Sequence, residues 1–294
     1  DVDFEGQSMY LNQGDTDLKN PTTSVVVNLI SALKRLAAKY GDNFILTMAP
    51  ETFFVQLGYQ FYGPGSTGGE DPRAGSFLPV IDALRDELTV LQVQEYNSGP
   101  IMGLDGQYHT MGSADFAIAM TDMLKAGFPV AGTNSVFAGL SDSQIAVGLP
   151  ADSQAGNGYI APSVVQQVLD CLMTGNNCGS YTLRGGTSPN LRGLMTWSIN
   201  WDGFSNWEFM TGNGGYLKNL SGGPPPTSTS TTQTANPTTT TTTTATSPTD
   251  TACVYGVWRC SGIYLQQCLT DGWTTRATCT GGQTCHGDTN PYCQ

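Results

Sequence analysis

The sequence predicts an α/β fold built on a parallel sheet, followed by a small cysteine-rich domain. Over about the first 220 residues, short apolar segments alternate with amphipathic segments, which is typical of repeated βα units. Polar and aromatic residues follow each apolar segment, where a strand would end, and a (β/α)8 TIM barrel places its active site there. Six of the eight cysteines crowd into the stretch Cys253–Cys293, which indicates a separate disulfide scaffold.

The first five residues of the chain, Asp-Val-Asp-Phe-Glu, form the most informative stretch. As a β-strand, they would place three carboxyl groups on one face and two apolar side chains on the other. Three neighbouring carboxyls repel one another, so at least one is expected to hold a proton. The pattern of Asp1, Asp3 and Glu5 suits an acid catalyst together with its tuning partners. The plainer alternative is an acidic, solvated chain end.

Four strand–helix units follow in order. We expect a helix capped by Thr22-Thr23, with Val26, Ile30 and Leu33 on one face and Gly41 as its stop. A Gly-rich loop precedes the second helix, and polar loops separate the later units. The expected strands are Phe44–Met48, Thr89–Gln94, Ile145–Leu149 and Leu194–Ser198, and the later helices are Phe77–Leu88, Ala114–Ala126 and Ala161–Thr174.

These segments supply five strand ends, if residues 1–5 count as a strand, whereas a closed barrel needs eight. We therefore expect about three strands with their helices to precede Asp1. This chain by itself should form an open, partial barrel of about strands 4–8, with an exposed apolar edge. Such a fragment would be a poor enzyme.

The chain divides into three parts by composition. Residues 1–223 hold the βα units, in which Cys171 and Cys178 are spaced to staple a helix end. Residues 224–251 are a linker in which 18 of 28 residues are Ser or Thr, so disorder and O-glycosylation are expected. Residues 252–294 are too few for a large core and depend on six cysteines, whose pairing the sequence leaves open.

Charge and hydropathy exclude several classes of protein. The formal net charge is −12, which argues against nucleic acid as a partner because nucleic-acid binding needs a basic face. No apolar run approaches the ~20 residues of a membrane span. Cysteine density favours an oxidising, extracellular setting. Metal binding by the tail is disfavoured because it has no C-x2-C pair and only one nearby histidine, His286. No cofactor or metal is implied.

Four motifs together resemble family 18 glycoside hydrolases, the chitinases. D-V-D-F-E looks like the end of the family's D-G-x-D-x-D-x-E signature, whose first Asp and following residues are absent here. Later barrel strands of the family resemble M-A-P-E at 48–51, Q-V-Q-E-Y-N-S-G at 92–99 and M-T-W-S-I-N-W-D at 195–202. The closest likeness is to secreted, Streptomyces-type bacterial chitinases. The cysteine spacing of the tail resembles fungal family 19 carbohydrate-binding modules, which bind chitin.

The resemblance implies hydrolysis of chitin with retention, by a reaction in which the substrate's own acetamido group takes part. By this resemblance, Glu5 protonates the glycosidic oxygen and Asp3 holds the acetamido N–H. Asp1 would share a proton with Asp3, and Tyr96 would donate its hydroxyl to the acetamido carbonyl. The implied partners are chitin and chitooligosaccharides, and we expect a secreted monomer.

Three further residues are implied in substrate binding, each with a simpler alternative. Trp197 would form the floor under the sugar ring, or lie in the core. Gln94 would line the pocket, or make a hydrogen bond inside the barrel. Met48 would contact ligand, although packing is the favoured interpretation by about two to one. Glu51 is interpreted as a loop charge.

In the tail, two or three of five aromatic side chains are expected to stack on sugar rings, and the others to form a minimal core. We favour Trp258, Trp273 and Tyr264 as binding residues. Two other functions fit the same motifs: an endo-β-N-acetylglucosaminidase acting on N-glycans, and a catalytically silent chitin-binding lectin. A chitin-binding tail argues against the first, and retention of Glu5 against the second. Endo or exo cleavage stays open.

Overall fold

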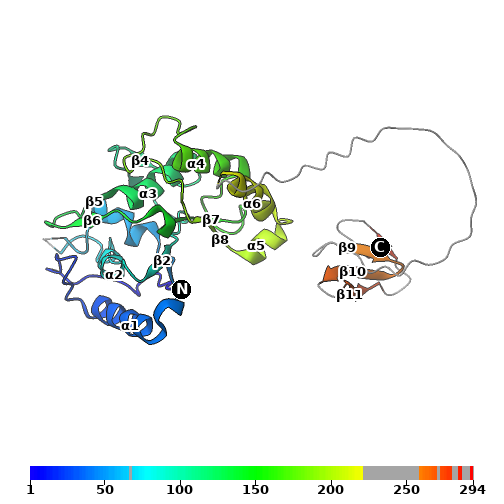
Figure 1. Cartoon of the computed structure of the whole chain (residues 1–294), viewed down its shortest axis with the longest axis horizontal. Helices are drawn as coiled ribbons and strands as arrows, with labels where there is room; N and C mark the ends of the chain where they lie inside the picture. The colour runs from blue at the N-terminus through cyan, green and yellow to red at the C-terminus, as the bar shows by residue number, and fades with distance from the viewer. Residues whose placement is uncertain (66–67, 221–257, 270–271, 280–283, 287–291, 294) are drawn as a thin grey trace, which may run out of the picture. The chain divides into compact units, whose positions relative to one another are not determined.

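The structure is a computed structural model that describes residues 1–65, 68–220, 258–269, 272–279, 284–286 and 292–293. The chain divides into two compact units, Asp1–Thr229 and Ser230–Gln294, and Figure 1 shows the elements of each. The predicted Ser/Thr-rich linker, residues 224–251, lies outside the described residues. Among the described residues, no helix is both long and apolar enough to cross a membrane.

The large unit is organised around parallel strands that follow one another in chain order. β1 pairs in parallel with β2, and β7 with β8, while isolated parallel bridges from Leu91 to Ile145 and from Gln94 to Gly148 link the second pair to the first. Buried apolar residues on both sides of these strands are typical of a parallel sheet covered by helices. The four strands are β1 (Leu46–Met48), β2 (Leu88–Leu91), β7 (Ala146–Pro150) and β8 (Gly193–Trp197).

The first five residues join this series beside β1. Val2 forms a parallel bridge with Met48, its N–H donates to the Thr47 carbonyl at 2.8 Å, and its carbonyl accepts from the Ala49 N–H at 2.9 Å. Within the described residues, β8 pairs with β7 alone. Within the described residues, the opening stretch and the four parallel strands form the open, partial (β/α)8 barrel that the sequence predicts, although residues 1–5 form a single bridge and not a full strand.

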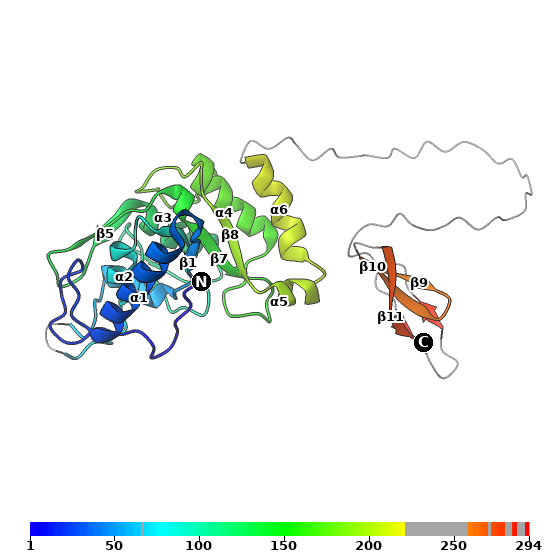
Figure 2. The ribbon, with the colours of Figure 1, turned by 60° about the horizontal axis from the view of Figure 1, so that its bottom comes forward.

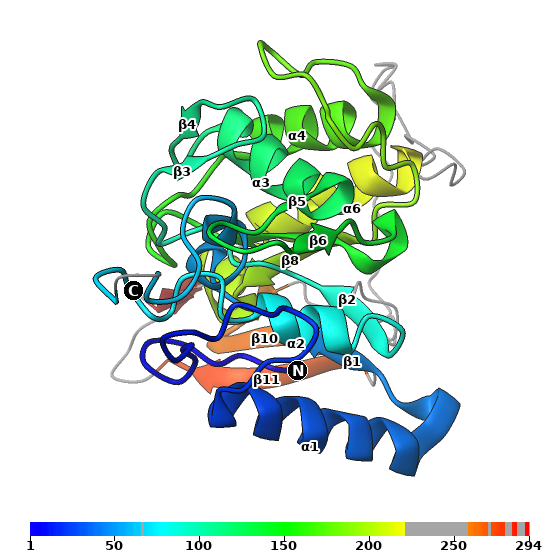
Figure 3. The same cartoon turned by 90° about the vertical axis from the view of Figure 1, so that its left-hand side faces the viewer.

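Helices cover the outside of the strands. Figure 3 shows α1 on one flank of β1 and β2, and α3 with α4 on the other side of the unit. α4 packs against both α3 and α6, which Figure 2 shows beside it. The helices are α1 (Ser24–Tyr40), α2 (Leu78–Ala83), α3 (Ala114–Ala126), α4 (Pro162–Thr174), α5 (Ile199–Phe204) and α6 (Glu208–Leu220).

Loops carry the remaining short elements of the large unit. Two antiparallel hairpins lie on them, and single turns of 3-10 helix lead into or out of the strands. The hairpins are β3 (Ile101–Met102) with β4 (Tyr108–His109) and β5 (Gly127–Pro129) with β6 (Val136–Ala138). The 3-10 turns are Gly41–Asn43, Thr52–Phe54, Gln56–Tyr59 and Asp142–Gln144.

Predictions that depend on neighbouring residues alone, such as the bounds of a helix or a short disulfide loop, are confirmed. α3 begins and ends at the predicted residues, because Ser113 accepts a hydrogen bond from the Phe116 N–H and Gly127 ends the helix at φ 72°. The disulfide between Cys171 and Cys178 is present, and it spans the end of α4 as expected.

Tertiary contacts override the prediction in two helices. α2 is shorter than the predicted Phe77–Leu88, because Arg85 leaves the helix to donate to the carbonyls of Ala138 and Gly139. Thr23 precedes α1 as predicted, but its side chain makes no cap. Its hydroxyl instead donates to the buried carboxylate of Asp15 at 2.6 Å.

The small unit contains a three-stranded antiparallel sheet. β10 lies between β9 and β11, and a two-stranded ladder is formed by β12 and β13. A disulfide joins Cys260 of β9 to Cys285 of β12, which ties the sheet to the ladder. The strands are β9 (Trp258–Ser261), β10 (Tyr264–Leu269), β11 (Gly272–Thr278), β12 (Cys285–His286) and β13 (Tyr292–Cys293).

Candidate active site

One pocket of the large unit gathers residues from the opening stretch and from the ends of three parallel strands. Its volume is about 380 Å³. The contributing segments are the opening stretch, β1, β2 and β8, which meet at one end of the partial barrel as parallel strands must. The lining residues are Asp3, Glu5, Glu51, Gln94, Tyr96, Asn97 and Trp197.

Gln94 is the hydrogen-bonding centre of this pocket. Its Nε2 donates to Asp3 Oδ1 at 3.0 Å, to Glu5 Oε1 at 2.8 Å and to the carbonyl oxygen of Ala49 at 2.9 Å. Only 6% of Gln94 is exposed. Hydrogen bonds to charged groups contribute about 1.5–3 kcal/mol each, more than those between neutral groups. Gln94 therefore holds the two carboxyls next to each other. It makes hydrogen bonds inside the barrel and also lines the pocket, so the two interpretations of this residue are compatible.

Asp3 and Glu5 form a coupled pair of carboxyls. Partial burial raises the pKa of Asp3, and the neighbouring charge of Glu5 raises it further, while the Gln94 amide opposes the shift. Because two neighbouring carboxylates repel each other, it is unfavourable for both of them to be ionised at once. Asp3 is therefore the carboxyl of this pair whose affinity for a proton is increased.

Asp1 lies apart from this pair. Its Oδ1 accepts from the Thr47 hydroxyl at 2.7 Å and from Gln92 Nε2 at 3.3 Å. Asp1 does not line the pocket. The structure therefore couples Asp3 to Glu5, whereas the expectation was a proton shared between Asp1 and Asp3. The difference arises because Thr47 on β1 offers Asp1 a hydroxyl.

The Tyr96 ring forms a wall of the pocket. The residue is 5% exposed, and burial together with the charges of Asp3 and Glu5 raises the pKa of its hydroxyl. A phenol whose pKa is raised keeps its proton at neutral pH, so Tyr96 is available as a donor.

Asn97 was absent from the sequence interpretation, yet it lines the pocket beside Tyr96. Its backbone N–H donates to the Asn157 carbonyl and its Oδ1 accepts from the Asn157 N–H, both at 2.8 Å. Asn97 has a left-handed φ of 50°, which Asn tolerates better than most residues. These two hydrogen bonds hold the loop that contains Asn157 beside the pocket. In the sequence, the position of Asn97 directly after Tyr96 at a strand end was the feature that could have indicated its place in the site.

Glu51 is more than the loop charge that the sequence suggested. It lies beside Gln94 through a parallel bridge, and the Gly6 N–H donates to its carboxylate. Burial and the charge of Glu5 nevertheless raise its pKa. The pocket therefore holds three carboxyls, which the spacing of residues 5 and 51 in the sequence does not reveal.

Trp197 and Met48 occupy different environments. Trp197 lines the pocket at the end of β8 with 51% of its surface exposed, so one part of the indole is open to a ligand. Met48 is fully buried in the hydrophobic core, next to Val2. This placement favours the packing interpretation of Met48 and corrects its assignment to ligand contact.

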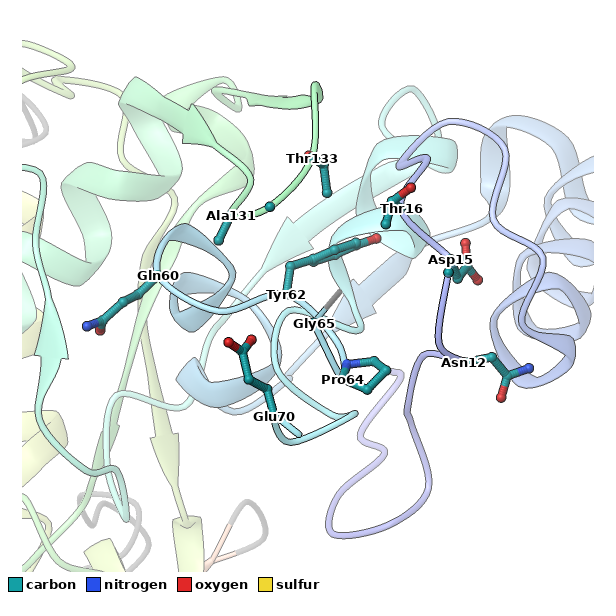
Figure 4. Close-up of a pocket in the computed structure, with 12 residues that line it drawn as sticks. Asn12, Asp15, Thr16, Gln60, Tyr62, Pro64, Gly65, Glu70, Ala131 and Thr133 are labelled. Carbon is teal, nitrogen blue, oxygen red and sulfur yellow. The ribbon is translucent and has the colours of Figure 1, made fainter. Parts of the chain in front are cut away.

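A second cavity, of about 150 Å³, lies among the loops that follow residues 1–5 and β1. In Figure 4 the Tyr62 hydroxyl points toward Asp15 and Thr16, whereas Glu70 lies on the other side of the cavity. Both Tyr62 and Asp15 are nine-tenths buried, and the Tyr62 hydroxyl and one Asp15 oxygen have no hydrogen-bond partner in the structure. The cavity contains none of the predicted site residues.

No group of three or more His, Cys, Asp or Glu side chains is placed to hold a metal ion within residues 1–65, 68–220 and the described parts of the small unit.

The fold and the pocket define a class: a β/α barrel with an acidic site at the carboxyl ends of its strands. The chain is 66% identical over 220 residues to a probable class II chitinase of Arthroderma benhamiae, covering 75% of this chain and 66% of that protein. It is 65% identical over 218 residues to exochitinase 1 of Streptomyces olivaceoviridis, covering 74% and 36%. No family model matches the chain.

Solved structures lead to the same family. A family GH18 chitinase from Chromobacterium violaceum superimposes with a TM-score of 0.61 at 40% identity, covering 66% of this chain and 50% of that one. A putative chitinase A from Streptomyces coelicolor gives 0.54 at 34% identity, covering 66% and 57%. The chain belongs to the family 18 glycoside hydrolases. The chain covers 66% of the length of the Arthroderma benhamiae protein and 36% of the length of the Streptomyces olivaceoviridis protein.

Proposed function

We propose that this chain carries the carboxyl-terminal part of the catalytic barrel of a secreted chitinase. The observation that carries the proposal is the Gln94 amide bound to both Asp3 and Glu5, in a pocket shared with Tyr96 and Trp197. The relatives named as chitinases support the choice of substrate. The domain boundaries that go with this proposal are 1–223, 224–251 and 252–294.

In the proposed reaction, Glu5 gives its proton to the glycosidic oxygen and the leaving sugar departs with that proton. The acetamido carbonyl oxygen of the bound sugar attacks the anomeric carbon, forming an oxazolinium ion. Glu5, now a carboxylate, takes a proton from water as the water opens this ring. Two inversions at the anomeric carbon give net retention.

The neighbours of Glu5 take supporting roles in this scheme. Asp3 accepts the acetamido N–H and offsets the positive charge of the oxazolinium ion. Tyr96 donates to the acetamido oxygen, which is consistent with its raised pKa. Trp197 offers an apolar surface under the sugar ring, and Gln94 keeps the two carboxyls at a fixed separation.

Retention is the sharpest test of this mechanism. A chain that carries all eight strands is incubated with chitooligosaccharide, and the anomers of the product are followed by proton NMR before mutarotation. We expect the β-anomer to form first. Initial formation of the α-anomer would contradict substrate assistance, and release of N-glycans from a glycoprotein without chitin hydrolysis would replace the proposed substrate.

Secretion and action as a monomer belong to the same proposal. The Cys171–Cys178 and Cys260–Cys285 disulfides support an oxidising compartment. Fractionation of the producing cells and sedimentation of the purified protein test these two statements directly.

A further inference from the structure

The cavity of about 150 Å³ lies where three separate segments of the large unit meet. These are the loop after the opening stretch, the loop after β1 and the turn between β5 and β6. The Leu11 N–H joins the first two by donating to the Pro72 carbonyl at 2.7 Å, and the Ala131 N–H ties the turn to the Gly58 carbonyl at 3.0 Å. The cavity shares no lining residue with the acidic pocket, so it is a separate place in the molecule.

Asp15 brings to this cavity a carboxylate that is only half satisfied. Its Oδ2 accepts from the Thr22 N–H at 3.0 Å and from the Thr23 N–H and hydroxyl at 2.7 and 2.6 Å, and three such bonds stabilise the ionised form. Its Oδ1 is buried without a hydrogen-bond partner, and no cationic side chain of the described residues forms an ion pair with Asp15. Because buried charges in proteins are normally paired or bound to a metal, Oδ1 is the atom that a cation would reach.

The Tyr62 hydroxyl is a second buried atom without a hydrogen-bond partner. Tyr62 is 5% exposed, and Figure 4 shows its hydroxyl pointing toward Asp15 and Thr16. Burial raises the pKa of Tyr62, and the charges of Asp15 and Asp17 raise it further, so the phenol keeps its proton and its oxygen is a neutral ligand. A buried polar atom that lacks a partner costs stability, and a ligand that contacts both atoms would recover that loss.

The side chains around the cavity select the kind of ligand. The charged ones are the carboxylates of Asp15 and Glu70, hydroxyls come from Thr16 and Tyr62, and no Lys, Arg, His or Cys lines the cavity. An anion would be repelled by this set. Oxygen donors without nitrogen or sulfur favour Ca²⁺ and Mg²⁺ over transition metals. Mg²⁺ demands a nearly ideal octahedron, whereas Ca²⁺ accepts an irregular arrangement of oxygens such as three loops supply.

The size of the cavity fits an ion that keeps part of its water shell. One water molecule takes about 30 Å³ in the liquid, so a cavity of about 150 Å³ is larger than a single bridging water requires. Within the described residues no three acidic, His or Cys side chains converge. Waters would therefore complete the coordination that Asp15, Glu70 and the hydroxyls begin.

We propose that this cavity binds a partly hydrated Ca²⁺ ion. Asp15 Oδ1 is the charged ligand, the Tyr62 hydroxyl is a neutral ligand, and Glu70, on the other side of the cavity in Figure 4, balances the remaining charge. The bound ion joins the loop after the opening stretch to the loop after β1. With so few carboxylates, we expect a dissociation constant of about 10⁻⁴–10⁻³ M, the range of weak extracellular sites.

The test is thermal unfolding of a chain with all eight strands, first treated with a chelator and then titrated with Ca²⁺, Mg²⁺ or Na⁺ at matched ionic strength. We expect Ca²⁺ alone to raise Tm, because it binds the folded state. Asp15→Asn keeps an acceptor for Thr22 and Thr23 but loses the charge, so it should weaken Ca²⁺ binding at least about tenfold. Asp42→Asn, at an exposed position after α1, is the matched control.

Tyr62→Phe is the sharper variant, because it removes only the hydroxyl that lacks a partner. Without Ca²⁺ this variant should unfold at the same temperature as the native chain or a higher one, since an unsatisfied buried atom is gone. With Ca²⁺ its Tm should rise less than that of the native chain. Tyr10→Phe, at an exposed tyrosine of the same loop, should respond to Ca²⁺ as the native chain does.

Three results would overturn this inference. An unchanged response to Ca²⁺ in folded Asp15→Asn and Tyr62→Phe variants would place the ion elsewhere, for example at the carboxyls of the acidic pocket. An equal response to Mg²⁺ or Na⁺ would remove the choice of Ca²⁺. No response to any of the three cations would leave the cavity to water alone. Because the measurement is of stability, each result stands whether or not the chain hydrolyses chitin.

Discussion

The acidic pocket of the large unit and the sheet of the small unit arrange polar and aromatic side chains in different ways. In the pocket, the carboxyls of Asp3 and Glu5 from the opening stretch both accept from one amide, Gln94, which lies almost entirely out of solvent. In the sheet of the small unit, Arg259, Gln266 and Thr275 lie side by side on neighbouring strands, and Tyr264 is exposed. Neighbouring carboxyls change each other's proton affinity, which serves chemistry, whereas an exposed aromatic side chain offers contact area, which serves binding.

The largest effect that this comparison predicts is at Glu5. In a chain with all eight strands, Glu5→Gln removes the proposed proton donor while keeping the acceptor atom for Gln94. We expect hydrolysis of a chromogenic chitooligosaccharide to fall by about 10²–10⁴-fold or more, with binding of the oligosaccharide retained. Glu87→Gln, on the turn before β2, is the control. If the rate of hydrolysis fell less than tenfold in a folded Glu5→Gln variant, another residue would have to be the acid.

The next effect concerns the amide that holds the carboxyls. Gln94→Leu preserves volume but removes the donor to Asp3 and Glu5, and we expect kcat to fall about 10–100-fold, since each such hydrogen bond is worth about 1.5–3 kcal/mol. Gln92→Leu is the matched control, because Gln92 contacts Asp1 instead. Equal losses in the two variants would mean that Asp1 is as important to the reaction as the Asp3–Glu5 pair.

Removing residues 224–294 tests whether the two regions act separately. Activity on soluble oligomers should stay within about twofold, because the pocket is built by residues 3–197. Activity on solid chitin should fall several-fold, because a tethered module raises the local concentration of enzyme at the surface. Parallel assays on both substrates measure this difference, and equal losses would make the small unit part of the catalytic domain.

The smallest effect is a pH dependence of stability that comes from the large unit. Glu95 is fully buried, and burial raises its pKa well above 4.5 although the Thr121 hydroxyl opposes the shift. A raised folded-state pKa means that the stabilising contribution of protonated Glu95 is full below 4.5 and is lost as pH rises through the folded value. As the pH rises above 4.5, the free energy of unfolding falls by about 1.4 kcal/mol for each unit between the unfolded-state pKa and the folded-state pKa of Glu95.

Glu95→Gln should remove this loss, so the variant gains stability over the native chain as pH rises. Urea unfolding at pH 4 and pH 8 measures the change. Asp86→Asn, at an exposed position, is the control. A constant difference between Glu95→Gln and the native chain at both pH values would show that Glu95 does not change its protonation over this range.

The sequence by itself determined the features that depend on near neighbours. Ser113 and Gly127 bound α3 through the capping atoms of a single helix, and only six residues lie between Cys171 of α4 and its partner Cys178. The order of the βα units, and with it the family, also follows from the one-dimensional pattern of strand ends. The helix caps and the cysteine pair act over one or two turns of chain, where local geometry leaves few alternatives.

Only the tertiary structure decided how the carboxyls are paired. Gln94 meets Asp3 and Glu5 across about ninety residues, Thr47 draws Asp1 away, and Glu51 enters the pocket through its bridge to Gln94. In the small unit, register alone placed Arg259 over Trp273 and left Tyr264 exposed. The physical reason is that a side chain's partners across a sheet are set by the register of separate strands, and a shift of one residue would turn every side chain to the other face.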